Sequence, residues 1–190
     1  YRNIWNLETH LFGDPTFHYS SISALDAAAG REGYSERHWR KILSAKEAHP
    51  DVKALAIRKL VRSGSISPEE LIRIQTEAAS GIVRLAAFDG NAEIAPDCFD
   101  KAILLALDDD YELLQRLGAK FATYNQSPAL AEKAARLFLD PLTSKRVLFH
   151  IKSLFVTIDG EKAKDLVRST PYWKGEEGKE SLYKYIDSNS

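Results

Sequence analysis

Arginine and lysine side chains at one-turn spacing are the groups in this sequence best suited to binding chemistry. Arg58 and Arg62 lie four residues apart in a predicted helix, where they share an outward face with Lys59. A guanidinium group presents a planar fork of N–H donors that matches a carboxylate or a phosphate. We expect the two arginines to hold one such anion together.

A second group of this kind lies further along the chain. At helical intervals, Arg146 and His150 fall on a polar stripe, and Phe149 falls beside the basic residues Lys145 and Lys152. An aromatic ring inside a charged rim is typical of a contact surface. Two interpretations of Phe149 stay open: contact with a partner, or packing against the C-terminal segment.

Residues that could catalyse a reaction do not converge. The sequence has no HExxH, GxSxG, Walker or GxGxxG motif, so zinc chemistry, acyl transfer and phosphate-loop chemistry lack their required residues. His49 is expected to be structural, and Cys98 a small buried thiol. The run Asp108-Asp109-Asp110 lacks the alternating oxygens of a calcium loop and is better explained as a helix cap. We therefore expect no enzymatic activity, no metal and no cofactor.

The composition excludes further classes of protein. The chain has 190 residues, of which 44% are hydrophobic and 28% charged, and a formal net charge of -1. This balance disfavours a surface built wholly for nucleic acid. No apolar run approaches the roughly 20 residues of a membrane span, and a single cysteine excludes an internal disulfide. We expect a cytoplasmic protein that does not enter a membrane.

Capping signals divide the sequence into a regular series of helices. Ser67-Pro68-Glu69-Glu70 and Ser127-Pro128 each offer a serine N-cap followed by a proline in the first turn. Gly64 and Gly90 mark helix ends. The predicted helices span residues 36–48, 51–63, 68–79, 81–88, 97–108, 110–124, 128–139, 144–158 and 161–169, after a helical start within residues 1–30.

Paired in order, these helices give four hairpins. Val52, Ile82, Leu113 and Val147 hold comparable apolar positions in the second helices, at spacings of about 30 to 34 residues. One hairpin cannot bury its apolar face alone, so the hairpins must stack. We predict an all-α fold, a right-handed α-α superhelix of about four antiparallel helical hairpins with terminal caps. The expected domains are an N-terminal helical cap over 1–34, helical repeats over 35–169 and a polar, aromatic tail over 170–190.

The first hairpin resembles a HEAT repeat. In His49-Pro50-Asp51-Val52-Lys53-Ala54-Leu55-Ala56-Ile57-Arg58-Lys59-Leu60, a proline and an aspartate in the turn precede a valine, a basic residue and an alanine-rich apolar helix. Gly81-Ile82-Val83-Arg84-Leu85-Ala86-Ala87 keeps the Val-Arg pair and the small residues, and the third and fourth hairpins keep the period and the apolar positions. The resemblance implies a curved stack whose second helices line the concave face.

Positive charge is concentrated on the predicted second helices, whereas the first helices together carry a net negative charge. A basic concave face attracts an acidic partner through a field that salt weakens. The alternative is that these cations are solvated helix edges paired locally with acids. The expected partner-binding residues are Lys53, Arg58, Lys59, Arg62, Arg84, Lys145, Arg146, Phe149, His150 and Lys152.

Two functions fit this surface. The first is a non-catalytic protein-binding module, acting as an adaptor, an inhibitor or an immunity-type antagonist, that binds an acidic protein partner. The second is nucleic-acid binding, because the architecture resembles HEAT-like DNA glycosylases, which use a basic concave face with aromatics and a carboxylate. Trp39 and Trp173 lie in a first helix and in the tail, with no acid assignable beside them. The charge balance favours the protein partner.

Overall fold

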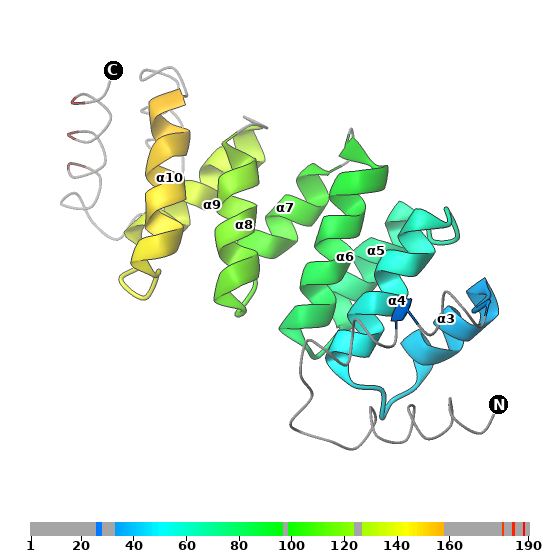
Figure 1. The fold of residues 1–190 in the computed structure, drawn as a ribbon. Helices are drawn as coiled ribbons and strands as arrows, with labels where there is room; N and C mark the ends of the chain where they lie inside the picture. The colour runs from blue at the N-terminus through cyan, green and yellow to red at the C-terminus, as the bar shows by residue number, and fades with distance from the viewer. Residues whose placement is uncertain are drawn as a thin grey trace. The chain divides into compact units, whose positions relative to one another are not determined.

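The structure of this chain is a computed structural model that describes residues 26–27, 33–96, 99–123 and 127–157, and single residues at 180, 184 and 188. All eight elements of these ranges are α-helices, so the all-α prediction is confirmed for the described part of the chain (Figure 1). Several predictions fall outside the described residues. They are those for residues 1–25, for Cys98 and Trp173, for the side chain of Lys152, for the helix at 161–169 and for the tail.

The helices belong to two compact units, Tyr1–Pro96 and Asp97–Ser190. The first unit contains α3 (Glu36–Ser44), α4 (Pro50–Arg62), α5 (Pro68–Glu77) and α6 (Gly81–Ile94). The second contains α7 (Asp100–Leu107), α8 (Glu112–Ala122), α9 (Pro128–Leu139) and α10 (Lys145–Thr157). The division falls inside the range predicted as one repeat array, and the predicted boundaries at 34 and 169 stay predictions.

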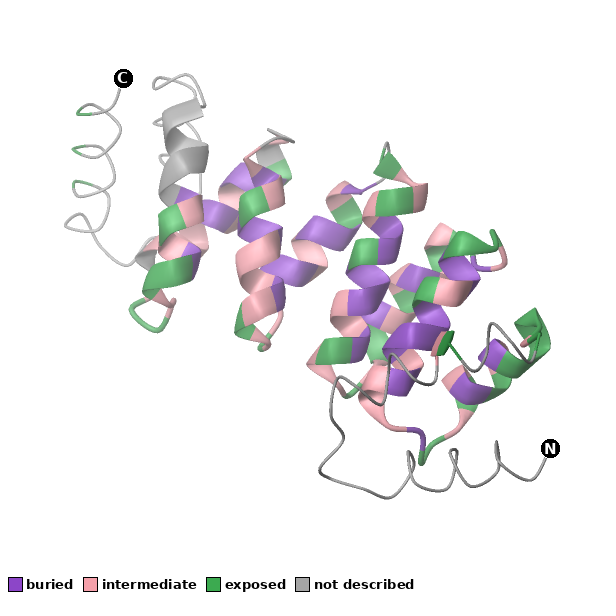
Figure 2. Ribbon diagram, in the orientation of Figure 1, coloured by how far each residue is buried: buried purple, intermediate pink, exposed green. Residues whose placement is uncertain are grey.

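The core of the first unit forms around α4. This helix packs against both α3 and α6, and α5 packs against α6. The apolar side chains of this helix are buried (Figure 2), among them Val52, Ala56, Ile57, Leu60 and Val61. Full burial of a large aliphatic side chain stabilises the fold by about 1.5 to 3 kcal/mol, so this one helix holds much of the unit together.

Local capping chemistry sets where several helices begin and end. The Ser67 hydroxyl accepts a hydrogen bond from the Glu70 amide at 3.2 Å, as predicted. After α4, Gly64 adopts a φ of +65°, which favours glycine because no Cβ is strained there. The amides of Gly64 and Ser65 then donate to the carbonyls of Val61 and Leu60, at 3.0 and 2.9 Å. This pair of bonds is a Schellman motif, and it ends α4 at the predicted place.

The prediction that Gly90 ends a helix is wrong. It lies inside α6, which continues to Ile94, and it is buried. A Cβ at this position would lie 2.9 Å from Cγ2 of Val61 and 3.2 Å from Cδ1 of Leu71. Glycine is present here because α6 passes close to α4 and α5, and not because the chain must turn.

In the second unit, α7 packs against α8 and α9, and α10 packs against the same two helices. The predicted cap at Asp109 takes a different form, since its carboxylate accepts from the Tyr111 amide at 2.8 Å in the turn before α8. α8 therefore begins at Glu112. The Ser144 hydroxyl caps the start of α10 by accepting from the Val147 amide, and it donates to the Glu112 carboxylate at 3.0 Å. These bonds fix the starts of α8 and α10 side by side.

A membrane-crossing helix would have to be longer and more apolar than any helix in the described part of the chain.

Candidate functional site

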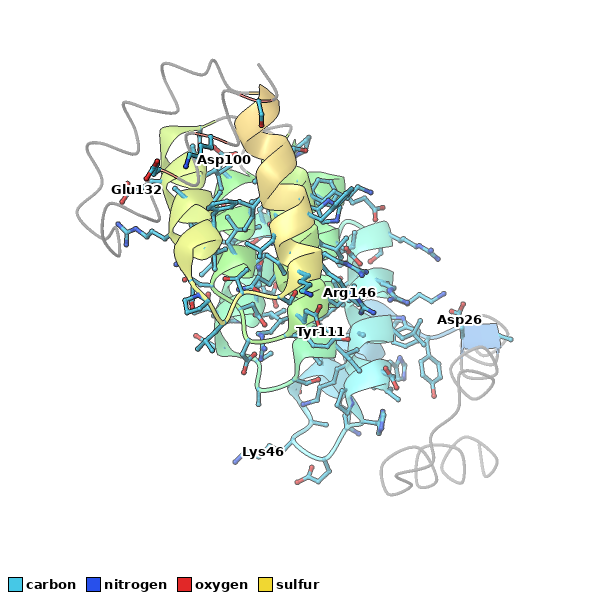
Figure 3. The ribbon with its side chains drawn as sticks, turned by 90° about the vertical axis from the view of Figure 1, so that its left-hand side faces the viewer. Asp26, Lys46, Asp100, Tyr111, Glu132 and Arg146 are labelled. Atoms are coloured by element: carbon cyan, nitrogen blue, oxygen red, sulfur yellow. The ribbon has the colours of Figure 1, made fainter. Side chains whose placement is uncertain are left out.

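A hollow between α8 and α10 brings basic side chains together around an aromatic ring. Its volume is about 480 Å³. We call it the α8–α10 patch, and Figure 3 shows one of its members, Arg146, on α10. The residues lining it are Arg116, Leu117, Lys120, Lys145, Arg146, Phe149 and His150. The lining contributes four basic side chains and no acidic one, so it favours an anionic ligand.

The buried faces of the two helices position this patch. On α10, Val147 and Ile151 are fully buried, which turns the neighbouring Arg146 and His150 away from the core. On α8, Leu114 is fully buried in the same way. The cations therefore stand on a rigid, packed base.

Phe149 is an exposed aromatic side chain in this patch. It is 69% exposed, and its ring meets the imidazole of His150 edge to face, with centroids 5.4 Å apart. An exposed phenylalanine inside a basic rim offers apolar area that loses water when a partner binds. Its exposure favours the contact interpretation.

His150 is the group of the patch whose pKa departs from its ordinary value. Partial burial lowers the pKa of its imidazole, and the positive charges of Arg116 and Lys120 on α8 lower this pKa further. Lys145 and Arg146 on its own helix also line the patch, and no residue of α9 does. An anion bound in the patch would favour the charged form of the imidazole and so oppose this lowering of its pKa.

Replacing His150 by glutamine is expected to reduce the loss of stability on acidification. Because the folded-state pKa lies below the unfolded value, the unfolded chain binds more protons as the pH falls through the unfolded pKa, and the fold loses stability. Urea unfolding of both proteins at about pH 7.5 and about pH 5.5 measures this loss. The wild type should lose more stability than the variant, and equal losses would contradict the prediction.

The chemistry available in the patch is anion binding. Two arginines and two lysines stay charged at neutral pH and can bind carboxylates or phosphates. The lining residues include no serine, cysteine or carboxylate that could act as a nucleophile beside His150. In the described ranges, no group of three or more histidine, cysteine, aspartate or glutamate residues could hold a metal ion.

The predicted site residues of the first unit do not gather in this way. Lys59 forms an ion pair with Asp26 at 2.5 Å. Arg84 donates to the carbonyls of Ala78 and Ala79, at 3.0 and 3.1 Å, beyond the last turn of α5. Lys59 therefore fits the alternative of local pairing with an acid, whereas Arg84 binds backbone carbonyls.

The other three predicted residues of this unit are distributed over two surfaces. Arg58 and Arg62 are both exposed on α4, in agreement with the shared outward face. Asp89 on α6 lies near Arg58, and its side chain reaches solvent. Partial desolvation by the surrounding atoms raises the pKa of its carboxyl, and the positive charge of Arg58 partly opposes that rise. Lys53 lies elsewhere, in a groove beside α3 and α5.

Sequence reasoning missed Arg116 and Lys120. Summing charges over the whole helix hid them, because acidic residues elsewhere on the predicted helix 110–124 cancel them. The signal that would have found them is the one used for Arg58 and Arg62, two cations one turn apart on one helix face.

Trp39, considered above as an aromatic of a nucleic-acid surface, is a core residue with 6% exposure. It is therefore not placed to stack on a base.

Comparisons of this chain with known protein families, with curated proteins and with solved structures find no match.

Proposed function

We propose that this chain is a non-catalytic protein-binding module that binds an acidic segment of a partner protein on the α8–α10 patch. The observation that carries the proposal is the grouping of four permanent cations around an exposed phenylalanine, without a carboxylate among the lining residues. A carboxylate-rich segment would replace the missing counter-charges, and an apolar side chain of the partner would cover Phe149.

A protein partner is favoured over nucleic acid by the extent of this charge. The basic groups line a hollow of about 480 Å³ on two helices, whereas duplex binding needs cations spread along many phosphates. The formal net charge of -1 also opposes attraction to a polyanion at long range. The buried Trp39 removes one aromatic from the resemblance to DNA glycosylases.

Selection of random displayed peptides on the purified protein tests the proposal. We expect the selected peptides to be enriched in aspartate and glutamate next to a large apolar residue. The double variant Lys145→Glu, Arg146→Glu should weaken their binding by at least about tenfold. Both residues are exposed, so the fold should tolerate the change.

The matched control is Arg37→Glu, Lys101→Glu, which replaces one arginine and one lysine at exposed positions. These positions line neither the α8–α10 patch nor the groove beside α3 and α5. Its affinity should stay within about twofold of wild type. The proposal fails if selection yields no acidic enrichment or if both double variants lose binding equally. Tighter binding of duplex DNA, falling steeply with added salt, would establish the nucleic-acid alternative instead.

The proposal also includes the superhelical arrangement of the helices and the cellular setting of the protein. A right-handed HEAT-like superhelix, with its second helices on a basic concave face, is supported by the all-helical composition and by contacts of α4 with α6 and of α8 with α10. A cytoplasmic setting is supported by the single cysteine of the chain.

A further inference from the structure

The first unit has a second and larger hollow, which the α8–α10 patch does not use. It measures about 900 Å³ and is lined by the facing parts of α3 and α5 and by the first turns of α4 and α6. We call it the α3–α5 groove. α3 packs mainly against α4, and α5 against α6. The two helices that wall the groove are therefore each held by a different neighbour.

The floor of the groove is the outer side of the hydrophobic core. Leu43, Ile74 and Ala78 are partly buried and pack against the core cluster of this unit, and all three line the groove. Val83 of α6, which is buried in the same cluster, lines it as well. A ligand seated here would add its apolar surface to an existing core, which is how a groove recognises an amphipathic segment.

The rim of the groove is positively charged. Five basic residues line it against two acidic ones, Glu70 and Glu77. Glu70 is already engaged inside the fold, because Arg40 binds it at 3.0 Å and Arg73 lies 3.9 Å away. Arg40 also donates to the carbonyl of Ser65, so it joins α3 to α5. The charge presented to a ligand comes mainly from the lysines of the rim, among them Lys46 and Lys53.

Helix ends strengthen this positive potential. The first turns of α4 and α6 both reach the groove, through Pro50 and Lys53 and through Ser80 and Val83. A helix N-terminus carries a partial positive charge that favours an anion. The Ser80 side chain forms no capping hydrogen bond to α6. Just beyond the negative end of α5, Arg84 donates to the carbonyls of Ala78 and Ala79 and so brings a positive charge close to that end.

We propose that the α3–α5 groove is a docking site for an acidic amphipathic segment of a partner protein. Large apolar side chains of the segment occupy the floor over Leu43 and Ile74, and its carboxylates meet Lys46, Lys53 and the N-terminus of α6. Lys46 stands in the turn after α3 and extends away from the ribbon (Figure 3), where it can reach the end of a bound segment. The groove belongs to the first unit and shares no lining residue with the α8–α10 patch.

A synthetic amphipathic peptide of about 14 residues, with leucine and phenylalanine on one helical face and glutamate on the other, serves as the probe. Fluorescence anisotropy measures its affinity for the full chain, and amide chemical shifts locate it. We expect shifts at the groove residues. Lys46→Glu, Lys53→Glu should weaken binding by at least about tenfold, and Ala79→Trp should block it. Ala79 is exposed and lines the groove, so a larger side chain there fills the site without disturbing the core.

Controls separate this site from the other one. Arg37→Glu, Lys101→Glu should leave the affinity within about twofold of wild type. Because the probe also carries the carboxylates and the aromatic side chain proposed to bind the α8–α10 patch, its affinity is measured in the Lys145→Glu, Arg146→Glu background as well. In that background the shifts at the groove residues and the loss of binding caused by Ala79→Trp should persist. A probe with lysine in place of glutamate should not bind. Shifts confined to α8 and α10, or unchanged affinity after Ala79→Trp, would overturn the proposal. Self-association of the chain that Ala79→Trp abolishes would also overturn it, because the occupant would then be a second copy.

Discussion

Replacing Phe88 by alanine is expected to lower the free energy of unfolding by about 3 to 5 kcal/mol, the usual cost of emptying a buried phenylalanine site. Phe88 lies in the middle of α6, is completely buried and heads the largest fully buried side chains of the described ranges. α6 is also the helix against which α4 and α5 both pack, so neighbouring backbone cannot collapse into the cavity without moving one of them. Urea unfolding followed by circular dichroism should show a lower midpoint with an unchanged slope.

The same substitution at an exposed phenylalanine is the matched control. Phe149→Ala removes an identical ring from α10, where 69% of it is exposed, and should change the free energy of unfolding by less than about 0.5 kcal/mol. Peptide binding should show the reverse order. Phe149→Ala should weaken it, and Phe88→Ala should not. A loss of stability in Phe149→Ala as large as in Phe88→Ala would restore the alternative that Phe149 packs against the C-terminal segment.

Helix positions were predictable wherever the signal is local. A serine followed by proline satisfies the first amides of a helix, and α5 and α9 begin at Pro68 and Pro128 as expected. Gly64 ends α4 because its own backbone angle requires glycine. Gly90 could not be interpreted correctly from the sequence, because its reason is the distance to side chains of α4 and α5. The residue type alone therefore does not distinguish a glycine needed for a turn from a glycine needed for close packing of helices.

The sequence predicted which residue types form the α8–α10 patch, but not every residue that the fold brings together there. Lys145, Arg146, Phe149 and His150 follow each other on one helix, so helical spacing alone placed them on a common surface. Arg116 and Lys120 join them because α8 packs against α10, which is a tertiary contact. The bond of Arg84 to the carbonyl of Ala78 could not be predicted from the sequence, because carbonyls beyond a helix end are available only once the helix has formed.

The close approach of α7 and α8 leads to the second large expected effect. A Cβ at Gly118 on α8 would lie 2.8 Å from Cβ of Ala106 and 3.2 Å from the backbone of Ala106 and Leu107 on α7. A helical glycine replaced by alanine normally gains about 1 kcal/mol from helix propensity. Here the atoms that must give way are mostly backbone, and overpacking of this kind costs about 1 to 3 kcal/mol. Gly118→Ala should therefore destabilise the protein, and Gly118→Val should lower the free energy of unfolding by about 3 kcal/mol or more.

Gly90→Ala is the control, because the atoms nearest to its new Cβ belong to the side chains of Val61 and Leu71 and not to backbone. It should destabilise less than Gly118→Ala. A double-mutant cycle assigns the effect to the contact: Ala106→Gly removes the opposing Cβ, so it should cost less stability in the Gly118→Ala background than in the wild type. Additive changes would show that the two positions do not touch. Since α8 carries Arg116 and Lys120, a shift of α8 away from α7 should also weaken peptide binding at the α8–α10 patch, although Gly118 itself does not line it.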